Sequence, residues 1–455
     1  MKTHQLILLT NVLFVTLFYG EEMGLNFGIL GISYALLTLL NTPEANRTRT
    51  FLVLFIMSIL SSVAFAWYGD FVSFLAVFMS IFLVAFKSRN RELKSLLVIP
   101  VFAVNFATFI YRLFQFDEWL PKRNTSETIK KLIAFILIPT FFVAVFSGVY
   151  ALGSEHFSGL FTGWEFDFDI WQFIVLSALG FFIAFNLWNF KIEKFIVGWN
   201  HSLKNDFLNE DKLSFSASSF LDIDSERKSG VISLVALNLL LLVFIITFSY
   251  EQFVEVAKTP SQLSGETHDR VNAVILSIVM AVLVILFYFK GKFNFDEKAK
   301  TLQVLAKIWI VLNAVLIISA LIKNAEYVVN LGITYKRLGV FAFLVLCFIG
   351  LVFTFIKIRE QKTSAFLIHQ MVWYFYGTVL AASFINWGYL ATAYNITNNK
   401  GDFSFHKSLN YNHKLLIDNY DEEFNKTKRS SDIKNEQTKT FLSKIIYYQT
   451  LKLPQ

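Results

Sequence analysis

Residues 51–86 read FLVLFIMSILSSVAFAWYGDFVSFLAVFMSIFLVAF, and this stretch decides the fold class of the chain. It holds two apolar runs, 51–68 and 71–86. Each is close to the length of a membrane-crossing helix, which needs about 20 residues with a range of about 17–25. Gly69 and Asp70 separate the runs and are typical turn residues. The stretch therefore predicts two transmembrane helices joined by a tight turn.

Similar apolar runs recur along most of the 455 residues, of which 55% are hydrophobic and only 16% charged. A soluble chain of this length rarely has such a composition, whereas a helical membrane protein does. We expect an all-α fold, a polytopic transmembrane helical bundle of about eleven spans plus one interfacial or re-entrant segment. The expected spans are 5–20, 23–40, 51–68, 71–86, 132–152, 171–190, 230–250, 271–289, 302–322, 338–356 and 365–394.

Lys and Arg residues are distributed unevenly between the loops that these spans define. Twenty-five fall on one side of the membrane and five on the other, leaving the C-terminal tail aside. Loop 153–170 has no Lys or Arg and carries four acidic residues. The positive-inside rule then places the N-terminus in the cytoplasm and the tail outside. Because the basic residues lie beside apolar runs, the net charge of +7 indicates a lipid bilayer rather than nucleic acid as the partner.

Two segments on the basic side are expected not to cross. The run 95–111 has basic residues on both flanks, so a crossing would put one group on the wrong side; we predict an interfacial or re-entrant segment. In 191–208, apolar residues recur at three- and four-residue steps, which predicts an amphipathic helix. Either it lies on the inner leaflet or it covers the cytoplasmic end of the bundle.

The chain divides into a transmembrane domain, 1–395, and a polar C-terminal tail, 396–455. The tail is rich in Asn, Lys, Asp and Ser, with two short apolar patches at 415–417 and 441–448. We expect it to be partly disordered, with one or two short helices.

Polar residues are densest at the outer ends of the later spans. A speculative ligand-binding site is formed there by His268, Arg270, Asn272, Asn313, Tyr335 and Arg337. Ionisable groups near membrane depth are costly and often functional. The competing interpretation is structural: charges at helix ends are solvated, capped or paired, and Asn313 joins neighbouring helices by a hydrogen bond.

The sequence lacks the usual catalytic and nucleotide-binding signatures. It contains no H-E-x-x-H, G-x-S-x-G, Walker A or G-x-G-x-x-G motif, so no catalytic residue and no cofactor is predicted. Its single cysteine, Cys347, and the scattered histidines do not predict a metal site. Carboxylates are nearly absent from the span interiors, which weakens an ion-coupled transport mechanism.

Three stretches, His268–Asn272, Trp309–Ala314 and Gly332–Val340, occur in this order and are separated by spans. They resemble the C-terminal half of the bacterial polytopic membrane proteins grouped as domains of unknown function 4153 and 4173. The resemblance covers roughly residues 1–395. It implies a bacterial inner-membrane location and adds weight to His268, Asn272, Asn313, Tyr335 and Arg337.

Three functions remain open at this point. The first is a non-enzymatic membrane protein that binds a small molecule or a membrane-protein partner at its outer polar site, as a sensor or accessory subunit. The second is a solute transporter or channel. The third, an intramembrane enzyme acting on lipid-linked substrates, would use His268 as a base, and a base must reach its substrate proton.

Overall fold

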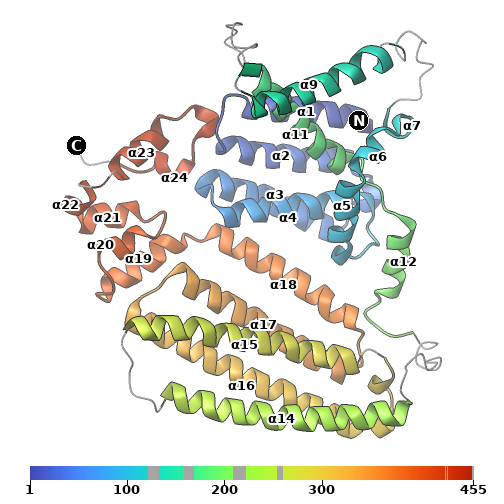
Figure 1. Ribbon diagram of the computed structural model, residues 1–455, viewed down its shortest axis with the longest axis vertical. Helices are drawn as coiled ribbons and strands as arrows, with labels where there is room; N and C mark the ends of the chain where they lie inside the picture. Colours follow the sequence, from blue (N-terminus) through green and yellow to red (C-terminus); the bar gives the residue numbers. More distant parts are fainter. Residues whose placement is uncertain are drawn as a thin grey trace.

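The computed structural model of the protein is helical (Figure 1). It describes residues 1–120, 131, 133–154, 156–157, 169–208, 222–253, 260–289, 291–425, 427 and 429–452. Within these residues, the backbone pairing of β type is a single antiparallel bridge between Asp206 and Lys362. Most of the acidic loop 153–170 lies outside the described residues.

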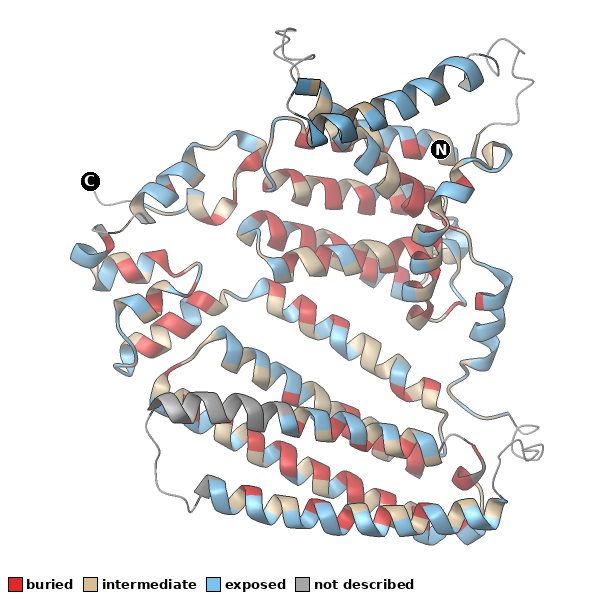
Figure 2. Cartoon of the chain, in the orientation of Figure 1, coloured by how far each residue is buried: buried red, intermediate tan, exposed pale blue. Residues whose placement is uncertain are grey.

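Seven helices of the described chain are long and apolar enough to cross a membrane, and four more are apolar but shorter. Many of their side chains point away from the protein: Ile232 is 68% and Leu240 65% exposed. Figure 2 shows this exposure along the outer faces of the helices. Exposed apolar surface on this scale requires lipid around it, so the chain is a multi-pass membrane protein.

Eleven helices of the described chain overlap the expected spans in the same order (Figure 1), while the number of crossings stays a prediction. They are α1 (Thr3–Phe18), α2 (Leu25–Asn41), α3 (Arg49–Tyr68), α4 (Phe71–Arg89), α9 (Ile138–Gly153), α11 (Ile170–Trp188), α14 (Ile223–Phe253), α15 (Pro260–Tyr288), α16 (Lys300–Leu331), α17 (Tyr335–Arg359) and α18 (Ser364–Phe384). The π-helical turn η3 (Ile133–Leu137) leads into α9.

Helices α1–α4 and α11 pack around one hydrophobic core and form the first bundle. Small residues let these helices approach closely, as is common in membranes. A Cβ on Gly28 would lie 2.8 Å from the Ser62 carbonyl oxygen, and α3 buries Ser58, Ser61 and Ser62. The predicted turn at Gly69 is confirmed: its φ is +65°, and the Asp70 side chain accepts a hydrogen bond from Ser73 N.

Helices α14–α17 surround a separate core and form the second bundle. Between the bundles lies α18, which contacts α3 and α4 on one side and α17 on the other (Figure 1). Its Tyr376 hydroxyl is hydrogen-bonded to Ser80 Oγ of α4 at 2.8 Å. The last expected span, 365–394, is therefore one spanning helix and a second helix, α19 (Trp387–Thr397), because Asn386 caps α19 through Tyr389 N.

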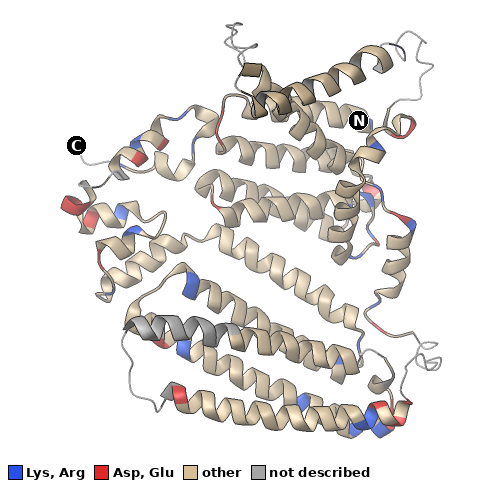
Figure 3. Ribbon diagram, in the orientation of Figure 1, with Lys and Arg blue, Asp and Glu red and all other residues tan. Residues whose placement is uncertain are grey.

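One end of the bundles, which we call the basic face, carries the N-terminus and the short helices between the spans. These are η1 (Glu44–Asn46), η2 (Ser95–Leu97), α5 (Val98–Ala107), α6 (Phe109–Leu113), α7 (Phe116–Trp119), α12 (Lys194–Ser202), η4 (Lys292–Asn294) and η5 (Glu297–Ala299). Lys and Arg residues are frequent there and rare along the spans (Figure 3).

The segment 95–111 stays at the basic face, and α5 and α6 are too short to cross. Asn105, 1% exposed, exchanges two 2.8 Å hydrogen bonds with the backbone of Lys191. Arg112 donates to Asn105 O at 3.1 Å and to Asn189 O at 2.6 Å. Burial lowers the pKa of Arg112 to about 10. The guanidinium remains charged and satisfies carbonyls at the C-terminal end of α11, where a cation is favoured.

The other end, which we call the tail face, holds the turn between α1 and α2, Gly69, the start of α17, and the C-terminal residues. The tail contains α20 (Phe403–Lys407), α21 (His413–Asn419), α22 (Asp421–Asn425), α23 (Arg429–Thr438), η6 (Phe441–Ser443) and α24 (Ile446–Gln449). Leu416, Phe424 and Ile433 form a small buried cluster. The tail thus has more helix than we expected; the domain boundary at 395 stays a prediction.

Replacing Asn105 by leucine tests how the segment 95–111 is held. The change leaves the half-buried backbone N–H and C=O of Lys191 without these partners, at a cost of about 1–3 kcal/mol. We expect a lower apparent melting temperature of the detergent-purified protein, measured by fluorescence-detected size exclusion. Asn419→Ala, at an exposed helix end, is the control and should melt like the wild type. Equal melting of all three proteins would contradict this account.

Candidate functional site

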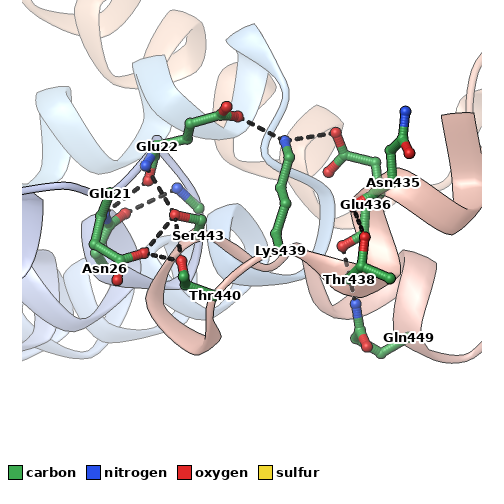
Figure 4. A network of polar contacts seen from close by, with 11 residues as sticks. Glu21, Glu22, Asn26, Asn435, Glu436, Thr438, Lys439, Thr440, Ser443 and Gln449 are labelled. Atoms are coloured by element: carbon green, nitrogen blue, oxygen red, sulfur yellow. Dashed lines mark hydrogen bonds and ion pairs between the residues drawn. The ribbon is translucent and has the colours of Figure 1, made fainter.

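The turn between α1 and α2 forms the first part of the tail face, and Asn26 fixes its shape. The Asn26 side chain is fully buried. Its Oδ1 accepts hydrogen bonds from Gly24 N and Phe27 N, each at 2.8 Å. Its Nδ2 donates to Leu17 O at 3.0 Å and Glu22 O at 2.8 Å. With its polar atoms bonded this way, Asn26 holds Glu21 and Glu22 toward the tail (Figure 4).

The tail docks on this turn through hydroxyl groups and backbone. The hydroxyls of Thr440 and Ser443 donate to the Glu21 carboxylate, and Ser443 Oγ accepts from Glu22 N at 2.8 Å (Figure 4). Close by, Leu25 N donates to Lys444 O at 2.9 Å. The contact excludes any side chain at position 24, since a Cβ on Gly24 would lie 2.4 Å from Ser443 O.

A lysine next to this contact joins the tail to the membrane helices electrostatically. Lys439 Nζ lies 2.8 Å from Glu22 Oε2 and 2.6 Å from Glu436 Oε1. The hydrogen bond and charge of Lys439 lower the pKa of Glu22. The pair is therefore fully formed above the ordinary pKa of glutamate and weakens as the pH falls below it.

A second contact joins the tail to α3 and to the break after α18. The Tyr411 hydroxyl donates to Tyr68 O, the last residue of α3. Asn386 Nδ2 donates to Tyr411 O at 3.0 Å. Burial raises the pKa of Tyr411, so the phenol stays protonated as this donor.

A third contact joins the tail region to the second bundle. The amide of Asn395 on α19 pairs with the backbone of Ile333, accepting from its N–H at 2.6 Å and donating to its carbonyl at 3.0 Å. The Tyr335 hydroxyl accepts from Asn410 N at 3.0 Å. Residues 387–452 therefore contact helix ends of both bundles.

Tyr335 and Arg337, two of the predicted site residues, lie at this third contact. Arg337 Nη1 donates to the carbonyls of Leu331 and Gly332, at the end of α16, and its own carbonyl accepts from Asn324 Nδ2 at 3.0 Å. Arg337 thus closes the turn between α16 and α17, and Tyr335 binds the tail. These contacts are structural, and a ligand-binding role for Tyr335 and Arg337 stays a prediction.

The other predicted residues lie elsewhere or outside the described side chains. His268, Arg270 and Asn272 fall on the N-terminal half of α15, in the part whose side chains the structure does not describe. Asn313 lies eighteen residues before the end of α16, or about 27 Å along the helix. Its Nδ2 donates to Trp309 O of its own helix, and its buried Oδ1 has no hydrogen-bond donor. The structure does not bring Asn313 to Tyr335 and Arg337.

A pocket of about 340 Å³ opens in the tail, within the size range of small-ligand sites. The pocket has two carboxylates on one face of α23, two amides, an imidazole and a phenol. Its lining residues are Asn410, His413, Asp432, Ile433, Asn435, Glu436 and Tyr448.

The pocket lies against a partly buried aromatic cluster. His413 is only 6% exposed, and its ring lies 5.8 Å from Tyr447 and 5.5 Å from Tyr448. Asp432 and Glu436 are four residues apart on α23 and so face the same way. Such a lining can accept hydrogen bonds from a small polar molecule. Within the described residues, no three His, Cys, Asp or Glu side chains are grouped to hold a metal ion.

Sequence reasoning missed this pocket because its residues come from three parts of a polar tail. Asn410 and His413 precede the apolar patch 415–417, and Tyr448 ends the patch 441–448. Those two patches were the available signal: apolar residues repeated in a polar segment indicate a small core, and a core can support a pocket.

The apolar helices, with a folded polar tail at one end, define a polytopic helical membrane protein. The chain belongs to the family described as domain of unknown function DUF4153, which matches residues 31–420. The predicted family is thereby confirmed, and the match extends into the tail as far as α21. No curated protein and no solved structure matches the chain.

Replacing Gly388 by alanine tests whether the tail is docked as described. A Cβ at this position would lie 1.6 Å from the Asn410 carbonyl oxygen and 2.7 Å from the Tyr335 hydroxyl. A methyl group does not fit at that distance unless the backbone at Asn410 moves away. The tail should therefore be displaced from α17. We expect faster cleavage of the tail in limited proteolysis of the membrane-embedded protein.

Gly339→Ala is the matched control, because a Cβ there has no atom within 4 Å. It should be cleaved at the wild-type rate. If Gly388→Ala is also cleaved at that rate, the tail does not dock on α17 through Asn410.

Proposed function

We propose that this protein is a non-enzymatic membrane sensor or accessory subunit that binds a small polar ligand in the tail pocket. The observation that carries the proposal is the double role of Asn410. It lines the pocket, while its backbone N–H is bonded to Tyr335 at the start of α17. A ligand that moves or orders Asn410 therefore acts directly on a helix of the second bundle.

The same pocket is also connected to the first bundle. Glu436 lines it and is bonded to Lys439, which in turn pairs with Glu22 between α1 and α2. A ligand can shift an equilibrium only by its difference in affinity between two states. If the docked and undocked tail bind the ligand differently, binding changes how the tail holds the two bundles together.

For the location, we propose the bacterial cytoplasmic membrane, with the N-terminus in the cytoplasm and the tail outside. Support comes from the charge distribution, since the basic face carries most Lys and Arg residues of the helical domain (Figure 3). Eleven crossings, an odd number, would put the N-terminus and the tail on opposite sides. Impermeant maleimide should then label Ser404→Cys and not Ser202→Cys in intact cells carrying Cys347→Ser.

A second candidate, a solute transporter, is favoured by one observation in the second bundle. Asn238 and Asn313 each have a buried Oδ1 without a hydrogen-bond donor, and buried polar groups of this kind are usually satisfied. A substrate hydroxyl or amine could supply the donor. Solute uptake into proteoliposomes that is lost in Asn313→Leu would support this candidate over the sensor.

The pocket is tested by a thermal-shift screen of the full-length protein in detergent. The screen should include amino acids, amines and monosaccharides, because the lining offers mainly hydrogen-bond acceptors. We expect one of these classes to raise the apparent melting temperature of the wild type. Asp432→Asn and Asn435→Ala should reduce that rise by half or more, since both residues are exposed in the pocket and dispensable for the tail core.

The control is Asp418→Asn, which removes an exposed carboxylate of α21 that does not line the pocket. It should keep the full rise. The proposal is wrong if no class raises the melting temperature, or if the rise is unchanged in both pocket variants.

A further inference from the structure

The outward side of α12 carries an exposed aromatic pair. Phe195 is 47% and Trp199 48% exposed, and their ring centroids lie 5.2 Å apart in a T-shaped arrangement. The two residues are four positions apart and so share one side of the helix. In Figure 1, α12 runs across the direction of the spans, along the basic face.

The opposite side of α12 is firmly attached to the first bundle. Ile196 is fully buried in its core, and Ile192 and Leu203 pack against the same core. Lys94 N donates to Asn200 Oδ1 at 3.0 Å. The exposure of Phe195 and Trp199 is therefore a fixed property of the fold and does not come from a loosely placed helix.

Two lysines flank this aromatic pair, and both are exposed: Lys194 and Lys204. Among the described residues, neither takes part in an ion pair, whereas two neighbouring carboxylates are already engaged. Glu118 pairs with Lys191, and Asp206 pairs with Lys362 at 2.6 Å. Glu193, the N-cap residue of α12, is exposed beside Lys194, so the two lysines and this carboxylate leave the patch with a net positive charge.

The neighbouring segment at the basic face extends the same kind of surface. On α6, Ile110 is 62% and Tyr111 69% exposed, and Phe114, directly after it, is 49% exposed. Lys191 joins the two segments, because its Nζ donates to Gln115 Oε1 at 2.8 Å. Apolar and aromatic side chains along a helix that lies across the spans are typical of the membrane–water interface.

We propose that Lys194, Phe195, Trp199 and Lys204, which we call the α12 patch, bind the headgroup of an anionic phospholipid in the leaflet at the basic face. The aromatic pair inserts beside the acyl chains, and the ammonium groups contact the phosphate. Charge complementarity selects this occupant: lysines at a membrane surface attract acidic lipids, while a zwitterionic lipid offers no net charge. This inference is independent of the ligand that the tail pocket takes.

The test is titration of a fluorescent phosphatidylglycerol into the full-length protein in neutral detergent, read by anisotropy. Each lysine near an anionic surface contributes a factor of about five in affinity. Lys194→Gln with Lys204→Gln should therefore weaken binding more than about tenfold. Phe195→Ser with Trp199→Ser should also weaken it, because the acyl contact is lost. Fluorescent phosphatidylcholine should bind the wild type far more weakly.

Matched charge removal elsewhere on the same face provides the control. Lys298 and Lys300 are exposed in and next to η5, and changing both to glutamine should leave the affinity within twofold. The proposal is overturned if this control weakens binding as much as the α12 variant, which would indicate diffuse attraction to the whole face. It is overturned as well if inorganic phosphate competes with the lipid at equal concentration, because the acyl chain would then add nothing.

Discussion

The structure depends on the docking of the tail across the ends of two helical bundles. Each bundle has its own core, and α18 alone runs between them within the described helices. On the tail face, Ser443 and Lys444 hold the turn of α1 and α2, while Asn395 and Asn410 hold the start of α17. These contacts satisfy polar groups at helix ends that lipid could not satisfy. They also place two pocket residues, Asn410 and Glu436, next to contacts with the two bundles.

On the basic face, cationic side chains satisfy the unpaired carbonyl groups at helix ends. Arg89 and Arg112 donate to carbonyls at the end of α11, and Lys357 Nζ donates to Phe289 O at the end of α15 at 2.6 Å. Part of the positive charge on this face is therefore structural, since it neutralises helix C-termini. Other lysines on this face, Lys194 and Lys204 among them, are exposed and belong to the patch proposed above to bind lipid.

Much of the fold could be predicted from sequence because membrane helices depend on local composition. Apolar runs and turn residues such as Gly69 located the helices, and the basic flanks of 95–111 led to the prediction that it does not cross, which agrees with its short helices α5 and α6. The break at Asn386 was missed because the run 365–394 is mostly apolar on both sides of it, and the signal for the break is a single side chain that caps the next helix. The site could be predicted only in part. Tyr335 was singled out from its place at a helix end, and its role in a ligand site stays a prediction; its partner Asn410 is 75 residues away and depends on tail docking.

The docking of the tail on both bundles is tested most directly by cross-linking in native membranes. Glu22→Cys and Lys439→Cys, in a Cys347→Ser background, replace two residues whose charged groups lie 2.8 Å apart. A short bifunctional thiol reagent should join them at high yield. The pair Glu22→Cys with Ser404→Cys should not react, because α20 lies apart from α2 (Figure 1). A failure of the first pair, or equal yields for both pairs, would contradict the account of a tail seated on the helix ends.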